Sequence, residues 1–416
     1  WITINEPLTI TQNGYGFGNH APGRCSDRKE CRAGDSGREP YIASKGLLLA
    51  HARAFRKWEA LGRPGKGCGI VLSADWRIPF TDSEADKAAA LRSLEWQVAL
   101  FADPIHFGHW PQSMSEILGD RLPALLPNEV AYVRGSHDGR FYMNSYTTYF
   151  ARERTPVSSI WLLWTLRSAS LLSLVACGLM LWRLFQQSGS YARQLLPVDE
   201  PKHVEMVPLE ADQTTEMTFT DDSEGYWMPH PMEGKCELLC GGAGRGVICM
   251  AMCSTFLVAF TKHFRGGLYI CHGHIVCDAN VETSGYNFTS YKPIGTPSSN
   301  GWLFNYGPGL AELVAWYNER YKGLAYVITE NGWGSAALSH EADEIRDTER
   351  CNYYADYIGN LSAIVAREHI RVEAYFAWSL MDNFEWADGY TTRFGITHVD
   401  FATQRRTPKM SSVWFR

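Results

Sequence analysis

The feature that most restricts the fold of this 416-residue chain is an alternation of short β-prone runs with long amphipathic helices. Such alternation is typical of βα units that build a parallel sheet, so we predict an α/β fold. The expected strands span 1–5, 69–73, 141–146, 325–329 and 372–378. The expected helices span 40–61, 86–101, 310–321 and 346–367, and Asp103-Pro104 should end the second of them.

Five strands do not close a (β/α)8 barrel, which needs eight. If the chain forms such a barrel, about three βα units would precede Trp1. No initiator Met and no signal peptide open the sequence, so we expect the true N-terminus to lie upstream.

The βα pattern stops between 160 and 276. This stretch contains an apolar segment at 159–185, an acidic linker at 196–233 and a Cys/Gly-rich segment at 236–277. We predict barrel units at 1–159, an atypical insert at 160–276 and further barrel units at 277–416. Our hypothesis is a retained intron or a gene-model error, and the alternative is a genuine membrane or regulatory insertion.

Charge and cysteine usage limit the partners and the compartment. A net charge of −6 does not provide the excess of positive charge that nucleic acid or anionic lipid would bind. We expect no membrane association unless 159–185 is a real membrane span. Seven of the 11 cysteines lie in one stretch, 177–277, and the other four are scattered. Scattered thiols suit a reduced compartment, so we expect a cytoplasmic rather than a secreted protein.

Two other sequence patterns give only weak support for a functional site. The spacing Cys236-x3-Cys240 and Cys249-x3-Cys253 could fit a zinc-binding cluster, but it is less compact than the knuckles of structural zinc sites. We therefore expect unpaired thiols and no metal. Asn287-Phe288-Thr289 and Asn360-Leu361-Ser362 are glycosylation sequons in form only.

Two carboxylates stand at the ends of predicted strands. Ile4-Asn5-Glu6-Pro7 closes the first strand, and Ile328-Thr329-Glu330-Asn331-Gly332 closes the strand at 325–329. In a barrel both would face one pocket at the carboxyl ends of the strands. A single strand-end Glu is more often a helix cap or a surface ion pair. A pair about 5–5.5 Å apart could instead hydrolyse a glycoside with retention, one as proton donor and one as nucleophile.

These two signatures resemble those of family-one glycoside hydrolases. Further matches follow in the family's order, the clearest being 377–387, with Trp378, Asn383, Phe384, Glu385 and Trp386. Others lie at 14–16, 21–23, 49–52, 101–105, 118–123, 143–148 and 393–395. The resemblance implies a (β/α)8 TIM barrel and a retaining β-glucosidase that needs no cofactor.

The resemblance also implies roles for individual residues. Glu6 would be the acid/base and Glu330 the nucleophile, while Asn5 would bind the sugar 2-hydroxyl and Tyr146 would hold Glu330. The remaining expected substrate-binding residues are Asn144, Trp378, Glu385, Trp386 and Phe394. For Trp378 and Trp386, core packing is the simpler reading of composition alone.

Retention places opposite demands on the two carboxyl groups. The proton donor of such a pair needs a raised pKa, whereas the nucleophile must stay ionised. The expected substrates are small β-glucosides or oligosaccharides such as cellobiose, although the sequence does not separate glucosidase from galactosidase or fucosidase activity. The alternatives are an inactive fragment or pseudoenzyme of the family and a membrane-anchored glycosidase-like protein.

Overall fold

The computed structural model describes residues 1–154, 278–338 and 340–416. The predicted insert at 160–276 lies outside these ranges, together with its apolar segment and its cysteine-rich segment. The domain boundaries at 159 and 277 therefore stay predictions. Within the ranges described, none of the helices combines the length and the apolar character needed to cross a membrane.

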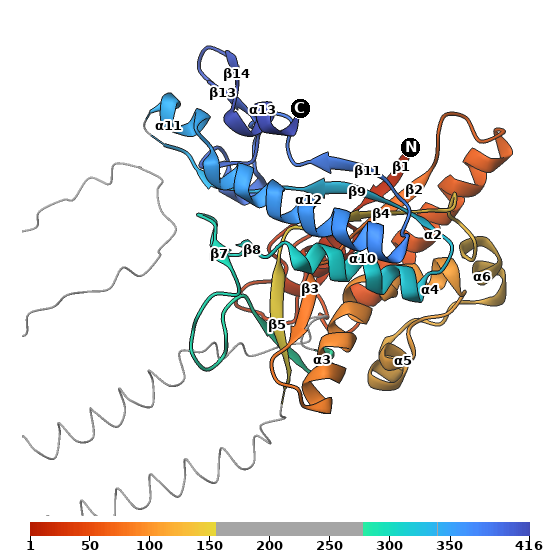
Figure 1. Ribbon diagram of the computed structural model, residues 1–416. Helices are drawn as coiled ribbons and strands as arrows, with labels where there is room; N and C mark the ends of the chain where they lie inside the picture. Colours follow the sequence, from red (N-terminus) through yellow and green to blue (C-terminus); the bar gives the residue numbers. More distant parts are fainter. Residues whose placement is uncertain (155–277, 339) are drawn as a thin grey trace, which may run out of the picture. The chain divides into compact units, whose positions relative to one another are not determined.

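A five-stranded parallel sheet forms the centre of the described structure (Figure 1). Its strand order is β1-β2-β4-β9-β11, and every neighbouring pair is parallel. The strands are β1 (Ile2–Asn5), β2 (Gly69–Ser73), β4 (Arg140–Asn144), β9 (Ala325–Asn331) and β11 (Val372–Ala377). All five predicted strands are thus confirmed, and because their carboxyl ends share one edge, strand-end side chains can meet there.

The two outer strands differ from the three inner ones in exposure. Most of β2 and β9 is buried, whereas Ile2 of β1 is 46% exposed and Phe376 of β11 is 55% exposed. Parallel sheets are normally covered on both faces and closed or protected at their edges. In the described residues the sheet is therefore a barrel wall with two open edges.

Helices follow the strands as predicted and pack outside the sheet. These are α2 (Glu39–Ala60), α3 (Glu84–Leu94), α10 (Pro308–Arg320) and α12 (Thr348–Glu368). Figure 1 shows α10 and α12 side by side across one face of the sheet. Their buried positions recur at helical spacing, as the sequence pattern requires.

The expected helix stop at Pro104 is wrong. The helix continues from α3 through a π-helical segment (Glu95–Ala99) into α4 (Leu100–His106), with Pro104 inside α4. Proline lacks a backbone N–H donor, but the residues after it can still form helical hydrogen bonds. The Phe107 amide, for example, donates to the Asp103 carbonyl at 2.6 Å. The proline is buried, so packing helps to keep the turn helical.

Smaller elements surround the sheet. A three-stranded sheet combines β3 (Trp76–Pro79), β5 (Thr148–Glu153) and β6 (Val281–Ser284). The remaining elements are α1 (Pro7–Thr11), a π-helix (Gln12–Phe17), α5 (Gln112–Leu118), α6 (Pro127–Val133), α11 (Glu341–Ile345), α13 (Met410–Phe415), 3-10 turns at Gly119–Arg121 and Trp386–Asp388, and the two-stranded pairs β7 (Thr296–Pro297) with β8 (Phe304–Asn305), β10 (Ser335–Ala336) with β12 (Thr392–Arg393), and β13 (Thr397–Val399) with β14 (Arg406–Pro408).

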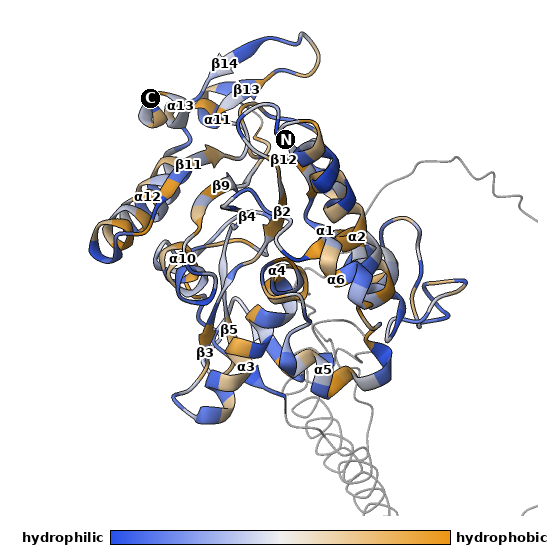
Figure 2. Ribbon diagram, turned by 90° about the vertical axis from the view of Figure 1, so that its right-hand side faces the viewer, coloured by the Kyte–Doolittle hydropathy of each residue, from blue (hydrophilic) through white to orange (hydrophobic). Residues whose placement is uncertain are grey.

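The main hydrophobic core lies between the parallel sheet and its helices. Figure 2 shows strand β2 coloured as hydrophobic, while α2 and α3 carry hydrophilic residues along part of their surface. Leu72, Met143 and Ile328 come from three different strands and are at most 3% exposed. Burial of apolar surface on this scale is the main force that aligns the strands.

Two of the four scattered cysteines are not free thiols, which corrects one expectation. Cys25 and Cys31 form a disulfide in the loop between the first π-helix and α2. Cys68 and Cys351 are free and buried. The disulfide partners lie six positions apart in the chain, so their pairing depends on the local loop rather than on any pattern visible in the spacing.

Two histidines, one buried and one half-buried, make the fold sensitive to acid. Burial lowers the pKa of His51 to about 4 and that of His106 to about 3, the latter with help from neighbouring His137. Both groups are neutral in the folded protein, so they stabilise it above pH 6.5, and this contribution is lost as the pH falls toward 3.

His106→Phe is therefore expected to stabilise the protein at pH 4 by about 1–3 kcal/mol relative to its effect at pH 7.5. The ring of His106 stacks on Phe141 with centroids 6.2 Å apart, and phenylalanine keeps this ring packing. Urea unfolding at both pH values measures the difference. His20→Phe, at an exposed position, is the control, and an equal shift in both variants would contradict the prediction.

Candidate active site

Glu6 lies immediately beyond β1, where the backbone turns sharply. Its φ of 47° is left-handed, which is uncommon for a residue with a side chain, and Pro7 begins α1 directly after it. The Glu6 amide donates to the Val71 carbonyl of β2 at 3.0 Å. Such backbone strain is found where the surrounding structure holds a functional side chain in place.

Both carboxylate oxygens of Glu6 are held by neighbours. Oε1 accepts a hydrogen bond from Asn144 Nδ2 at 2.8 Å, and Oε2 accepts one from the Thr9 hydroxyl at 3.0 Å. Thr9 comes from α1 and Asn144 from the end of β4. The carboxylate is therefore positioned by two elements before any ligand binds.

Glu330 lies near the end of β9, next to Asn144 in the sheet register. Its Oε2 accepts a hydrogen bond from the Tyr146 hydroxyl at 2.7 Å, as the sequence predicts. Its Oε1 accepts a longer one from Asn5 Nδ2 at 3.5 Å. Gly332 follows because a Cβ at this position would collide with the Trp378 carbonyl.

The two carboxylates belong to one hydrogen-bond network. Asn144 Nδ2 contacts both Glu6 and Asn5, at 2.8 and 3.2 Å, and Asn5 in turn reaches Glu330. The Thr329 hydroxyl donates to Asn144 Oδ1 at 2.6 Å and so fixes the orientation of its amide. The structure thus brings together the strand-end side chains of β1, β4 and β9.

Asn144 and Phe394 are placed differently from the other predicted substrate contacts. Asn144 is fully buried, and its amide is occupied by protein partners. Phe394 is 3% exposed and packs edge-on against Tyr146 with ring centroids 6.1 Å apart. Both residues therefore support side chains of the site from behind rather than lining its surface.

Tyr146 is fixed by partners that the sequence analysis missed. Its backbone carbonyl accepts hydrogen bonds from Tyr353 and Tyr357 of α12, at 2.7 and 3.0 Å, and its amide donates to Asp75 at 3.0 Å. Asp75 follows strand β2, so the same strand-end rule that identified Glu6 could have found it. The two tyrosines lie in the middle of a helix, where no sequence signal distinguishes them from core residues.

The electrostatics of Glu330 differ from expectation. Burial raises the pKa of its carboxyl to about 7, and the charges of Glu6 and Glu385 act in the same direction against the Tyr146 hydrogen bond. The sequence analysis expected an ionised nucleophile at neutral pH. A pKa of about 7 leaves the carboxyl only partly ionised at neutral pH, because no cation among the described residues offsets the cost of burying the charge.

Tyr146 stays protonated and can only donate to Glu330. Burial and the adjacent Glu330 charge raise the pKa of the Tyr146 hydroxyl well above its usual value. The hydrogen bond therefore favours the ionised form of Glu330 and lowers its pKa. The Glu330 oxygen held by Tyr146 is the better constrained of the two.

The segment after β11 carries the remaining predicted residues. Glu385 is partly buried, and burial raises its pKa to about 6. A hydrogen bond with the Trp378 side chain acts in the opposite direction and lowers this pKa. Trp378 packs partly against the core, whereas Trp386 is 74% exposed. A sugar face could stack on either indole.

A further aromatic residue, which the sequence did not reveal as part of the site, lies beside Tyr146. Trp302 is 43% exposed, and its ring meets Tyr146 edge-on at 5.9 Å. It precedes β8, a two-residue strand with no recognisable pattern. Its exposed ring beside the Glu330 partner offers an apolar surface to whatever occupies the site.

A charged cluster anchors the segment that bears Glu385. Asp382 accepts hydrogen bonds from the Gly395 amide and Lys409 Nζ, both at 2.9 Å, and lies 3.4 Å from Arg393. Glu344, Asp382 and His398 place potential metal-ligand atoms within 4.8 Å of one another. Arg393 and Lys409 already neutralise the two carboxylates, so a divalent cation here would face two positive charges.

Asp382→Asn is expected to destabilise the protein by about 3–5 kcal/mol, because it leaves Lys409 buried without its counter-charge. Lys409 is 1% exposed. Removing both charges in Asp382→Asn/Lys409→Met should recover much of this loss, as judged by urea unfolding of the single and double variants. Additive effects of the two substitutions would show that the pair is not coupled.

The family comparison covers most of the described chain. The family model Glycosyl hydrolase family 1 matches residues 1–163 and 271–416. A curated relative, β-glucosidase 1B of Phanerodontia chrysosporium, is 32% identical over 100% of this chain and 56% of its own length. The chain thus spans little more than half of that relative.

Solved structures of β-glucosidases are also similar to this chain. A β-glucosidase of the fungus Humicola insolens in complex with glucose is 29% identical, with a TM-score of 0.69, over 100% of this chain and 64% of its own. A rice β-glucosidase mutant in a covalent complex with Glc is 26% identical, with a TM-score of 0.69, over 100% and 65% of the respective chains.

Proposed function

Since this chain belongs to glycosyl hydrolase family 1 and its five-stranded parallel sheet forms part of that family's (β/α)8 barrel, we propose that it is a retaining β-glucosidase. The proposed substrates are small β-glucosides, including oligosaccharides such as cellobiose, cleaved at the terminal β-D-glucosyl residue. One observation carries the proposal: Glu6 and Glu330, at the ends of two strands of one sheet, share a hydrogen-bond network through Asn5 and Asn144.

In the first step Glu330 attacks the anomeric carbon while Glu6 donates its proton to the leaving oxygen. Oε2 of Glu330 is held by Tyr146, so Oε1, with its longer contact to Asn5, is the attacking oxygen. The C–O bond to the aglycone breaks as the bond to Glu330 forms. The glycosyl-enzyme is an ester, so the negative charge of Glu330 disappears.

In the second step Glu6 acts as a base. Loss of the Glu330 charge removes an electrostatic restraint, and Glu6, already deprotonated by the first step, accepts a proton from water. Water attacks the anomeric carbon from the face that the aglycone has left, which gives net retention. Asn5 is exposed beside Glu330 and can meet the 2-hydroxyl, where contacts strengthen as positive charge develops.

Groups around the carboxylates hold the sugar. Glu385 accepts hydrogen bonds from the outer hydroxyls, with Trp378 and Trp386 offering indole faces. Trp302, exposed beside Tyr146, provides an apolar platform for the aglycone. This arrangement suits a glucoside with an apolar or aryl aglycone.

A 2-deoxy-2-fluoroglucoside with a dinitrophenyl leaving group tests the proposal. Such a leaving group needs little protonation, so labelling of Glu330 depends on the ionisation of Glu330 itself. Because the pKa of Glu330 is raised to about 7, the labelling rate is expected to rise with pH through 7 and to fall about tenfold per unit well below it. Mass spectrometry locates the label.

Tyr146→Phe is the informative variant for this profile. It removes the hydrogen bond that lowers the pKa of Glu330, so the acidic limb should move to higher pH. Tyr142→Phe, in strand β4 four residues before Tyr146 and bonded to Asp138 at 2.8 Å, should leave the limb in place. A label on a residue other than Glu330 would contradict the assignment of Glu330, and a labelling rate that does not change between pH 5 and 8 would contradict its raised pKa.

A second candidate, an inactive member of the family, is favoured by one observation. No cation among the described residues offsets the charge of Glu330, whose pKa is raised to about 7. In this case folded protein would remain unlabelled at every pH. The same experiment therefore separates the two candidates.

A further inference from the structure

The loop that precedes α2 is built around a disulfide. Cys25 and Cys31 are joined, and their exposed fractions are only 2% and 3%. Gly18 packs so closely on Cys31 Sγ that a Cβ there would collide with it. The Ser26 and Ser36 amides each donate to the other's hydroxyl, at 2.8 and 2.9 Å.

This packing points to an oxidising compartment. Disulfides form and persist in secretory and extracellular surroundings and are reduced in the cytosol. If the disulfide were reduced, the two thiol groups of Cys25 and Cys31 would have to fit into a space that is packed around a single S–S bond. The disulfide therefore argues against the cytoplasmic location that we expected from the cysteine distribution. In a secretory compartment, the two sequons would meet the enzymes that attach N-linked glycans.

The first sequon lies in the loop between β6 and β7. Asn287 Oδ1 accepts hydrogen bonds from the Thr289 and Ser290 amides, at 3.0 and 2.8 Å. In the described part of the chain, Asn287 Nδ2 has no hydrogen-bond partner, and Thr289 is exposed. The turn thus occupies the oxygen of the amide and leaves its nitrogen available.

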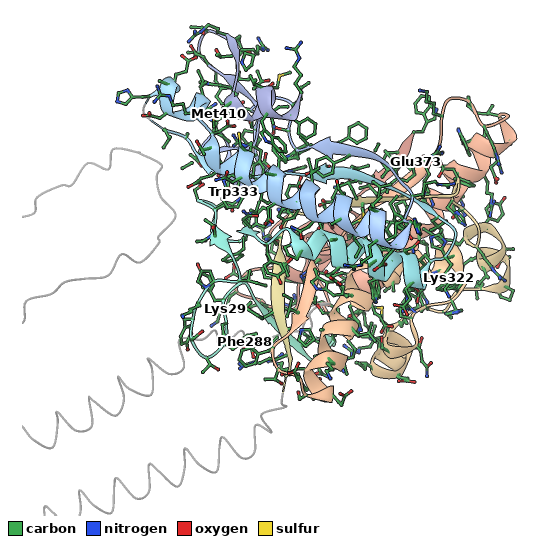
Figure 3. All side chains as sticks on the ribbon, in the orientation of Figure 1. Lys29, Phe288, Lys322, Trp333, Glu373 and Met410 are labelled. Carbon is green, nitrogen blue, oxygen red and sulfur yellow. A yellow bond between two sulfur atoms is a disulfide. The ribbon has the colours of Figure 1, made fainter. Side chains whose placement is uncertain are left out.

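The residue between Asn287 and Thr289 anchors the loop. Phe288 packs edge-on against Phe80 with centroids 5.0 Å apart, and the Arg152 guanidinium lies 4.1 Å from its ring centroid. Figure 3 labels Phe288 near the end of β5. These contacts fix the half-buried central side chain, while Thr289 of the sequon is exposed on the surface of the described structure.

The second sequon serves as an internal contrast. Asn360 lies inside α12, and its Nδ2 donates to the Asp356 carbonyl at 2.8 Å and to Asp356 Oδ1 at 2.9 Å. Leu361 is 5% exposed, within the core. The acceptor nitrogen is engaged, and a glycan there would disturb helix packing.

We propose that Asn287 carries an N-linked glycan, attached in the compartment that forms the Cys25–Cys31 disulfide. The donor is an oligosaccharide linked to a lipid diphosphate. Asn287 Nδ2 forms a bond to the anomeric carbon of the sugar and loses one proton, while the bond from that carbon to the diphosphate oxygen breaks and the lipid diphosphate leaves. Asn360 remains unmodified.

The test uses the full chain purified from the cells that produce it. The protein is alkylated without reductant, deglycosylated by an amidase in heavy-oxygen water and mapped by mass spectrometry. We expect a labelled aspartate at position 287, an unmodified Asn360, and Cys25 and Cys31 free of alkylation. Unlabelled Asn287 would overturn the proposal, and equal labelling at Asn360 would overturn the structural selection of Asn287.

Variants made in a eukaryotic secretory host separate sequon loss from folding failure. Asn287→Gln and Thr289→Ala should each lose one glycan, whereas Asn360→Gln should keep the wild-type mass shift. Thr289→Ala retains Asn287 and its hydrogen bonds to backbone amides, so it tests the sequon alone. A glycan that persists in Thr289→Ala protein would contradict the assignment.

Discussion

Glu330→Gln is expected to lower kcat/KM for an aryl β-glucoside by a factor on the order of 10⁴ or more, because it removes the nucleophile of the covalent step. Glutamine keeps the size of the side chain and can still meet Tyr146 and Asn5, which contact Glu330 at 2.7 and 3.5 Å. Initial rates with a nitrophenyl glucoside measure the loss. Glu319→Gln, at an exposed position of α10, is the matched control.

The same substitution should stabilise the protein at alkaline pH. The folded-state pKa of Glu330 is raised from 4.5 to about 7, so ionised Glu330 destabilises the fold as the pH rises through this interval. At pH 8 Glu330→Gln is expected to gain about 1–3 kcal/mol relative to its effect at pH 4.5. An inactive and more stable variant is the signature of a carboxylate buried for function.

One result would contradict this assignment, and another would contradict the raised pKa of Glu330. Activity above about a hundredth of wild type would exclude Glu330 as the nucleophile, since the covalent route could not survive its removal. Equal stability changes at pH 4.5 and 8 would show that the buried carboxylate does not titrate in this interval. Unfolding by urea and steady-state rates on one preparation address both points.

The parallel sheet was predictable because its strands carry strong local signals. The apolar run at 69–73 matches β2, and the β-prone run at 325–329 lies within β9. The small sheet of β3, β5 and β6 was not predicted, because its strands are short and gain their order from contacts distant in the chain. Pro104 shows the same limit, since tertiary packing overrode a local helix-breaking signal.

For the site, strand ends identified the carboxylates but not their surroundings. Glu6 and Glu330 follow from the rule that barrel strands end at the active face. The left-handed turn at Glu6 has no sequence signal, because only the assembled sheet imposes it. The raised pKa of Glu330 depends on burial by residues from several elements, which periodicity does not reveal.

Glu6→Gln should separate substrates by their leaving groups. For cellobiose or an alkyl glucoside, whose leaving oxygen needs a proton, kcat/KM is expected to fall by about 10²–10⁴-fold. For a dinitrophenyl glucoside the first step should proceed at nearly the wild-type rate, because that leaving group departs without protonation. Deglycosylation still needs the base, so kcat falls and the glycosyl-enzyme accumulates.

The measurement is a pre-steady-state burst of dinitrophenol together with the intact mass of the trapped intermediate. Glu6→Asp keeps a carboxyl group but withdraws it by one methylene from Asn144 and Thr9, which hold Glu6 at 2.8 and 3.0 Å. Its loss on cellobiose should be intermediate. If Glu6→Gln slowed both substrates equally and gave no burst, Glu6 would be a structural residue, because only an acid/base makes the defect depend on the leaving group.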